Sequence, residues 1–238
     1  MQTVALPRIS VIIPTLNEAK NLPILLPRLP TWIHDLVIID GRSVDNTVEV
    51  ARALRPDTKI VMCTTRGKGA ALRAGFEEAE GEIIVMMDAD GSMDPGQIIT
   101  FVAALMAGAD FVKGSRFLQG GGTDDMSLIR QFGNWCLTQL VRTMYGGSFT
   151  DLCYGYIAFW SRHLPVFENT ANGFEIETLL NVRAMKAQLN IVEVASFEYN
   201  RIHGESNLRA VPDGLRVLRT ILTERLRSDS PASSIGQA

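Results

Sequence analysis

The sequence predicts an α/β protein with an open, mostly parallel central sheet flanked by helices. Two observations predict it. In the first half of the chain, short apolar runs alternate with stretches of helical periodicity, which is typical of βαβ units. The chain of 238 residues is 46% hydrophobic and 21% charged, the composition of a globular domain with a sizeable core. No apolar run approaches the ~18–20 residues that would cross a bilayer.

The strands are expected where short, mainly β-branched or aromatic runs stop at polar turns. They fall at residues 9–13, 36–39, 59–63, 82–87, 111–114, 156–160 and 191–194. Runs without polar alternation are typical of strands that are buried on both faces of a parallel sheet. The ligand site of such a sheet lies beyond the carboxyl ends of its strands.

Helices are expected between and after these strands, at residues 19–29, 45–54, 70–79, 95–107, 127–144, 175–186 and 211–227. Asp94 is a candidate N-cap, because Pro95 after it suits a first helical turn. The last helix is amphipathic and carries an apolar stripe on one face, formed by Leu215, Leu218, Ile221, Leu222 and Leu226. We therefore expect one domain over residues 1–209, followed by an amphipathic helix and a disordered tail over residues 210–238.

Charge and cysteine content narrow the functional classes. With 23 basic and 26 acidic residues the net charge is −3, so the sequence does not predict a nucleic-acid partner. The three cysteines lack metal-site spacing, and an odd number does not suggest a disulfide framework. No signal peptide is apparent at the N-terminus. The sequence therefore predicts a cytoplasmic protein, and peripheral attachment to the inner face of the membrane stays open.

An acidic pair is the most informative local motif. Asp88 and Asp90 follow an apolar strand, and residues i and i+2 of an extended segment face the same side. The two carboxylates can therefore hold one divalent cation, which a transferase needs to neutralise a departing diphosphate. The alternative is the nucleophile loop of a haloacid-dehalogenase-like phosphatase, with Asp88 attacking phosphate and Asp90 acting as acid and base.

Other candidates surround this pair. Asp40 ends the second strand and could accept hydrogen bonds from a nucleoside. Lys68 stands between two glycines before a helix and could contact a diphosphate, although the segment matches neither a Walker loop nor a dinucleotide fingerprint. Arg116, Arg130 and Arg201 are candidate phosphate ligands, because a guanidinium grips phosphate with two parallel donors.

Taken in order, the motifs resemble glycosyltransferase family 2, in particular its dolichyl-phosphate mannosyltransferase-like branch. The matching segments are 11–18, 40–47, 67–69, 87–90, 114–116, 121–122, 130, 150–152, 173–177 and 201–206. The resemblance implies a Rossmann-like GT-A fold, a UDP- or GDP-linked sugar donor, Mg2+ or Mn2+, and inversion at the anomeric carbon. It also implies a nucleoside site lined by Pro14, Leu16, Glu18, Asp40 and Lys68, with Asp88 and Asp90 on the metal and diphosphate.

Three alternatives stay open for the activity and its partners. A polyprenyl-type phosphate is already a dianion at neutral pH and needs no catalytic base. A hydroxyl acceptor needs a carboxylate base, for which Asp151 and Glu175 are candidates. A non-catalytic nucleotide-binding protein would not need to retain both Asp88 and Asp90. The 211–227 helix could lie on a membrane, on the core, or on a second subunit of a homodimer.

Overall fold

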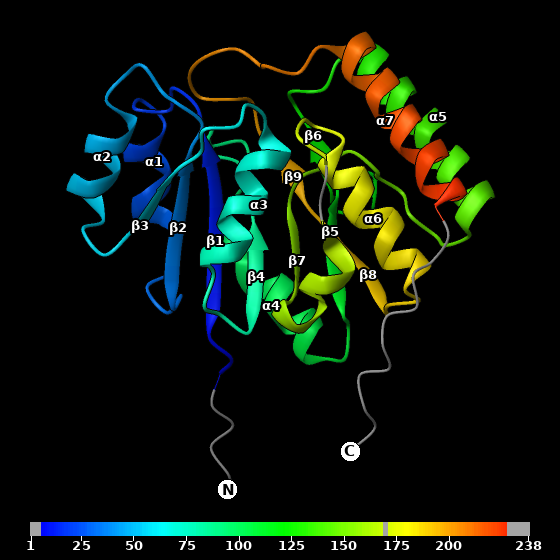
Figure 1. The fold of residues 1–238 in the computed structure, drawn as a ribbon, viewed down its shortest axis with the longest axis horizontal. Helices are drawn as coiled ribbons and strands as arrows, with labels where there is room; N and C mark the ends of the chain where they lie inside the picture. The colour runs from blue at the N-terminus through cyan, green and yellow to red at the C-terminus, as the bar shows by residue number, and fades with distance from the viewer. Residues whose placement is uncertain (1–5, 169–170, 228–238) are drawn as a thin grey trace, which may run out of the picture.

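The computed structural model describes residues 6–168 and 171–227, and its centre is one seven-stranded sheet (Figure 1). Its strands are β1 (Ile9–Thr15), β2 (Asp35–Asp40), β3 (Lys59–Met62), β4 (Ile83–Met86), β5 (Phe111–Ser115), β7 (Ile157–Trp160) and β8 (Ile191–Ala195). The strand order is β3-β2-β1-β4-β7-β5-β8, and β7 alone runs antiparallel to its two neighbours. All seven expected strands and the mostly parallel sheet are confirmed.

The strand order contains a switch point between β1 and β4. From β1 the chain passes to β2 and β3 on one side, and β4 lies on the other side. Loops from adjacent strands diverge at such a point, which leaves a crevice at the carboxyl edge. The loops that begin at Leu16 and at Met87 both start at this crevice.

Seven α-helices lie in the described ranges. They are α1 (Leu22–Leu25), α2 (Thr47–Leu54), α3 (Lys68–Glu78), α4 (Ile98–Met106), α5 (Leu128–Tyr145), α6 (Ile176–Lys186) and α7 (Ala210–Leu226). The helix expected over residues 19–29 is only one short α-turn followed by the 3-10 turn Leu26–Arg28, since Pro27 has no N–H to donate to the Pro23 carbonyl. Asp94 does act as a cap, accepting from the Gly96 N–H at the 3-10 turn Pro95–Gln97. A third 3-10 segment, Ser161–Phe167, follows β7.

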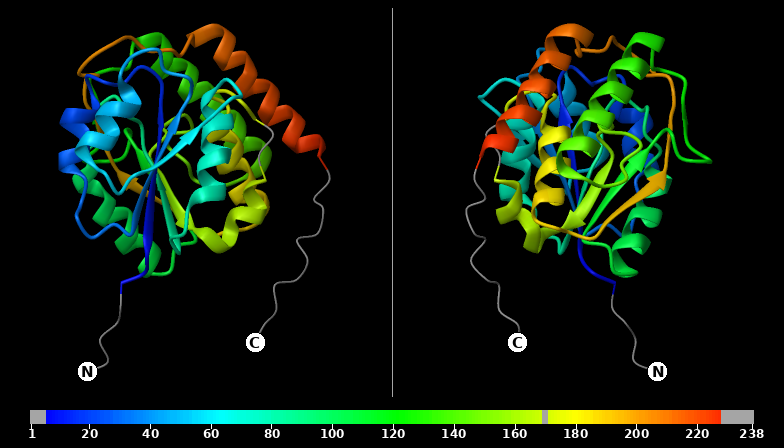
Figure 2. Two further views of the ribbon diagram at one scale, coloured as in Figure 1. Left: turned by 60° about the vertical axis from the view of Figure 1, so that its left-hand side comes forward. Right: turned by 90° about the vertical axis from the view of Figure 1, so that its right-hand side faces the viewer.

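The sheet is buried on both faces. Figure 2 shows helices on both sides of it. Alternate residues of β1 enter different cores: Val11 and Ile13 pack with α1 and α4, whereas Ile12 packs with α3 and α6. The same alternation holds in β4, where the Ile83 side chain belongs to the first core and the Ile84 side chain to the second. Burial on both faces explains why these strands are continuous apolar runs.

Helices α5 and α7 lie side by side beyond the sheet, against α6 (Figures 1 and 2). A small third core joins them, made of Val141, Leu152, Val182, Val217 and Ile221. The face that α7 buries is therefore centred on Val217 and Ile221. Much of the predicted leucine stripe instead faces solvent, including Leu215, Leu222 and Leu226.

The sequence did not predict the second sheet. Strand β6 (Gly122–Thr123) pairs in parallel with β9 (Phe197–Glu198), so part of the glycine-rich segment 120–125 is paired. Gly122 is required there, because a Cβ would lie 2.5 Å from the Phe197 ring. The division of the chain at residue 209 stays a prediction, and the expected disordered tail from residue 228 lies outside the described residues. Among the described helices none has the length and apolarity to span a membrane.

Candidate active site

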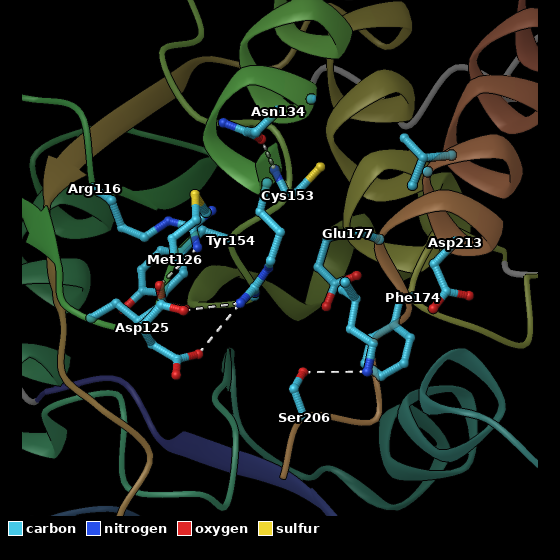
Figure 3. Close-up of a pocket in the computed structure, with 18 of the residues that line it drawn as sticks. Arg116, Asp125, Met126, Asn134, Cys153, Tyr154, Phe174, Glu177, Ser206 and Asp213 are labelled. Atoms are coloured by element: carbon cyan, nitrogen blue, oxygen red, sulfur yellow. Dashed lines mark hydrogen bonds and ion pairs between the residues drawn. The ribbon is translucent and has the colours of Figure 1, made fainter. Parts of the chain in front are cut away.

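A pocket of about 340 Å³ opens beside the carboxyl ends of β4 and β5 and continues between α5 and α7. Its walls come from the loop after β4, the segment before β7, and the first turns of α5, α6 and α7. Figure 3 shows Arg116, Tyr154 and Asp125 on one side of it and Glu177 and Asp213 on the other. Lys68, Asp88, Asp90, Arg130 and Arg201 also line it, so the structure brings together six of the ten predicted site residues: the acidic pair, the lysine and all three arginines.

Both carboxylates of the predicted metal site face cations of the chain itself. Asp90 lies 2.8 Å from Arg201 Nη2, and its other oxygen accepts from the backbone N–H and the hydroxyl of Ser92. Asp88 lies 2.5 Å from Lys68 Nζ. Two negative charges are thus balanced by two side chains that come from distant parts of the sequence.

Glu18 stands near the same charges. Burial raises the pKa of its carboxyl to about 7, and the negative charges of Asp90 and Asp88 add to that effect. The hydrogen bond from Asn21 and the charge of Arg201 act in the opposite direction. A group that titrates near neutral pH at a strand end is typical of functional sites.

Of the nucleoside residues implied by the family resemblance, only Lys68 lines the pocket. Pro14 lies near the end of β1, Leu16 and Glu18 follow that strand, and Asp40 ends β2 at the same edge of the sheet. Asp40 is fully buried, and its carboxylate accepts from the N–H groups of Arg42 and Ser43 at 3.0 and 2.9 Å. Asp40 therefore organises the turn after β2, and its contact with a nucleoside stays a prediction.

Arg116 is the most constrained of the three arginines. It donates from Nε and Nη2 to the two oxygens of Asp151 at 2.7 and 2.9 Å, and from Nη1 to Glu198 at 3.0 Å. Its guanidinium also lies 4.7 Å from the Tyr154 ring centroid. Burial disfavours the charge of Asp151, but Arg116 outweighs it, so the pKa of Asp151 is lowered.

Arg130 and Arg201 are less enclosed. The Arg130 side chain is 24% exposed and donates to the Asp125 carbonyl at 3.2 Å. The Arg201 side chain is 18% exposed, against 2% for Arg116. These two guanidinium groups can therefore exchange their present partners for a ligand more readily than Arg116 can.

The glycines beside Lys68 do not form a phosphate cradle. The N–H groups of Gly69 and Ala70, at the start of α3, donate to the Asn172 carbonyl. A Cβ at Gly67 or at Gly69 would overlap the backbone of residues 171–172. The glycines thus let that segment cross the start of α3. The N–H groups there are already paired, so the group that this segment offers to a diphosphate is the Lys68 ammonium.

Sequence reasoning missed two residues of the pocket. Glu177 belongs to a quoted motif without an assigned role, and its carboxylate lies 2.7 Å from Lys68 Nζ. Glu198 binds Arg116 and accepts from the Thr123 hydroxyl across the small β6–β9 sheet. No local signal marks either contact, because the partners are distant in sequence.

The acidic pair fits a divalent cation whose coordination a ligand completes. In the part of the chain that the structure describes, no three His, Cys, Asp or Glu side chains form a metal-binding group. Mg2+ in nucleotide sites is commonly held by one or two carboxylates together with phosphate oxygens and water. Asp88 and Asp90 supply that minimal protein share at the pocket wall.

Every carboxylate that lines the pocket has a cationic partner. The pairs are Asp88–Lys68, Glu177–Lys68, Asp90–Arg201, Asp125–Arg130, Glu198–Arg116 and Asp213–Arg216. The two candidate bases for a hydroxyl acceptor do not line the pocket: Asp151 is fully buried, and Glu175 accepts from the N–H groups of Asn172 and Gly173. The fold is that of an α/β protein whose ligand site lies at the carboxyl edge of a mostly parallel sheet.

Comparison with known proteins gives the family. The family model described as glycosyl transferase family 2 matches residues 10–164, and the chain belongs to that family. It is 32% identical over 215 residues to an undecaprenyl-phosphate mannosyltransferase of Micrococcus luteus, covering 84% of this chain and 87% of that protein. It is 34% identical over 201 residues to a polyprenol monophosphomannose synthase of Mycolicibacterium smegmatis, covering 79% and 76%.

Solved structures agree on the fold. A glucosyl-3-phosphoglycerate synthase of Mycobacterium tuberculosis, crystallised with Mn2+, UDP and glucosyl-3-phosphoglycerate, superposes with a TM-score of 0.74 at 22% identity, covering 94% of this chain and 82% of that one. The resemblance to glycosyltransferase family 2, the GT-A fold and the assignment as a glycosyltransferase are thus confirmed. The phosphatase alternative and the non-catalytic alternative lose their basis.

Proposed function

We propose that this protein moves a sugar from a nucleotide-diphosphate sugar to a polyprenyl-type phosphate, with Mg2+ or Mn2+ held by Asp88 and Asp90. A cation bound there would neutralise the charge that gathers on the departing diphosphate. The observation that carries the choice of acceptor is the pairing of all six pocket carboxylates with Lys or Arg. No carboxylate of the pocket is left unpaired to take a proton from a hydroxyl acceptor.

A phosphate acceptor needs no such base. A phosphate monoester carries most of its second negative charge at neutral pH, so it can attack without losing a proton to the protein. The protein then has to align the nucleophile with the leaving group and offset charge. Arg130 and Arg201 suit that task, because their guanidinium groups line the pocket and are partly exposed.

The part of the pocket between α5 and α7 suits an apolar chain. Between α5 and α7 the lining changes to Ile129, Phe132, Leu137, Leu208, Val211 and Val217. An acceptor with its phosphate at Arg130 could therefore extend an isoprenoid tail along these helices. The names of the two relatives, an undecaprenyl-phosphate and a polyprenol enzyme, support the same class of acceptor.

The same helices carry an apolar outer surface that supports peripheral membrane attachment. On α5 the exposed residues are Leu128, Ile129, Phe132 and Trp135, and on α7 they include Val211, Leu215 and Leu222. Arg216, Arg219 and Arg225 are also exposed on α7. Apolar residues beside arginines suit the interface of an anionic membrane.

The test of the acceptor is a transfer assay with the full chain, Mn2+ and a panel of labelled UDP- and GDP-sugars. We expect label in a lipid product when a polyprenyl phosphate is supplied, and none with the matching polyprenol, which lacks the phosphate. Transfer to the free alcohol or to a soluble sugar at the same rate would overturn the proposal.

The test of the surface is co-sedimentation with vesicles that contain anionic lipid. The double change Phe132→Glu and Trp135→Glu should abolish binding, since both side chains are exposed and their loss leaves the core intact. Met62→Glu is the matched control, because Met62 is an exposed apolar residue on β3 at the opposite edge of the sheet. Equal binding by both variants would contradict the proposed surface.

A further inference from the structure

Three charged groups from three separate elements meet in the pocket wall. Lys68 starts α3, Asp88 follows β4, and Glu177 stands in the first turn of α6. The Lys68 ammonium lies 2.5 Å from Asp88 and 2.7 Å from Glu177. The Glu177 side chain is 5% exposed, so its carboxylate is committed to this contact rather than to water.

A fourth segment, at Gly155, lies close to the end of Lys68. A Cβ at this position would lie 2.8 Å from Lys68 Nζ, 3.2 Å from Glu177 Oε1 and 3.5 Å from Asp88 Oδ2. The backbone just before β7 therefore lies close to the three charged groups and leaves no room for a side chain at Gly155. Alanine at this position would keep every charge and displace mainly the flexible end of Lys68.

The glycines at the start of α3 complete the arrangement. Gly67 and Gly69 allow residues 171–172 to cross α3, and the chain then enters α6 with Glu177. Because residues 171–172 lie against the start of α3, the first turn of α6 and its Glu177 lie close to Lys68. Gly155 thus lies at the ion cluster itself, while Gly67 and Gly69 permit the crossing of residues 171–172 that precedes Glu177.

We propose that Glu177 is a positioning residue that acts through Lys68: it retains the Lys68 ammonium in the pocket when Asp88 turns to the metal. Lys68 and a divalent cation compete for Asp88. A second carboxylate on Lys68 weakens its hold on Asp88 and keeps a positive charge beside the diphosphate. The inference rests on the metal site proposed above, and it deepens that site.

The experiment is a double-mutant cycle that measures binding of Mn2+ alone, by the loss of the free Mn2+ EPR signal. Glu177→Gln should weaken Mn2+ binding by about tenfold, the lower range for outer-shell partners of metal sites. In a Lys68→Met background the same change should have less than ~2-fold effect, since Asp88 then has no competing ammonium. The cycle separates action through Lys68 from a general loss of negative charge or of packing.

A second variant guards against misfolding. Gly155→Ala should strengthen Mn2+ binding, because it displaces the competing Lys68 ammonium from Asp88 without removing a charge. Gly133→Ala is its matched control: Gly133 also lines the pocket, but a Cβ there meets nothing within 4 Å. Thermal denaturation of each variant verifies that it is folded.

The outcomes are distinct. Equal weakening by Glu177→Gln in both backgrounds, or no weakening in the first, would overturn the positioning role while the metal site stands. If the metal site itself is wrong, the result differs. Either the Asp90→Asn variant binds Mn2+ as tightly as the unaltered protein, or the unaltered protein binds no Mn2+. Either result would overturn the inference together with the site on which it rests.

Discussion

Two clusters of ion pairs line the same pocket, and they differ in how firmly they are held. In the first cluster, Asp88 pairs with Lys68 and Asp90 pairs with Arg201 just after β4. A ligand can replace these partners. In the second, Arg116 is enclosed by Asp151 and Glu198 with a 2% exposed side chain. The contrast indicates that the first cluster is built for binding and the second for holding the pocket in shape.

The largest expected effect is on catalysis at the first cluster. Asp90→Asn should reduce metal-dependent sugar transfer by ~100-fold or more, because the leaving charge loses part of its stabilisation. Its melting temperature should stay close to that of the unaltered protein. Asp94→Asn is the control, as it removes the same charge four residues later and outside the pocket lining. Full activity of Asp90→Asn would break the proposed division between the clusters.

The next effect is on stability at the second cluster. Asp151→Asn should lower the free energy of unfolding by about 3–5 kcal/mol, because Arg116 then remains buried without its bidentate partner. Urea denaturation would measure this loss. The double change Arg116→Met and Asp151→Leu should recover part of it, since the buried guanidinium is removed together with Asp151 and Glu198 keeps the hydrogen bond from the Thr123 hydroxyl. A loss that the double variant does not recover would point to packing rather than to the ion pair.

A smaller effect separates the arginines. Arg130→Met should raise the KM for the phosphate acceptor by about tenfold, the value of one charge-assisted hydrogen bond. The donor KM and the unfolding free energy should change little, because Arg130 is partly exposed and holds Asp125 only loosely. Steady-state kinetics with each substrate varied in turn would show it. An equal rise in both KM values would place Arg130 on the donor instead.

The last expected effect is the pH dependence that Glu18 gives to stability. Its pKa is raised from 4.5 to about 7 in the folded chain. Between those values the folded protein binds a proton that the unfolded chain releases, so stability should fall as pH rises through this window. Glu18→Gln should remove that contribution. Melting temperatures of both proteins across the window would test it, and parallel profiles would refute the assignment.

The sheet and the acidic pair could be predicted from the sequence because their signals are local. A strand that is buried on both faces is an apolar run, and Asp88 and Asp90 directly follow one. Lys68, Arg130 and Arg201 stand in motifs that the family resemblance supplies, and the structure places all three in the pocket. These parts needed no knowledge of distant contacts.

The partners of these residues could not be predicted, since they depend on which loops cross. Glu177 reaches Lys68 because two glycines let the chain pass over α3, and Glu198 reaches Arg116 through a sheet of two-residue strands. The outward leucines of α7 show a similar limit: periodicity identifies a stripe, but the position of α5 and α6 decides which part of the helix is buried.

The reversed strand β7 has a consequence for engineering. Strand β7 runs antiparallel to β4 and begins beside the carboxyl end of β4. The residues just before β7, including Gly155, therefore lie at the same edge of the sheet as Asp88, although they belong to the second half of the chain. Chimeras that exchange this half to alter acceptor choice would also replace the backbone against which Lys68 and Asp88 rest. Donor and acceptor preferences should therefore prove hard to recombine between relatives unless residues 153–177 are kept with the parent that supplies α3.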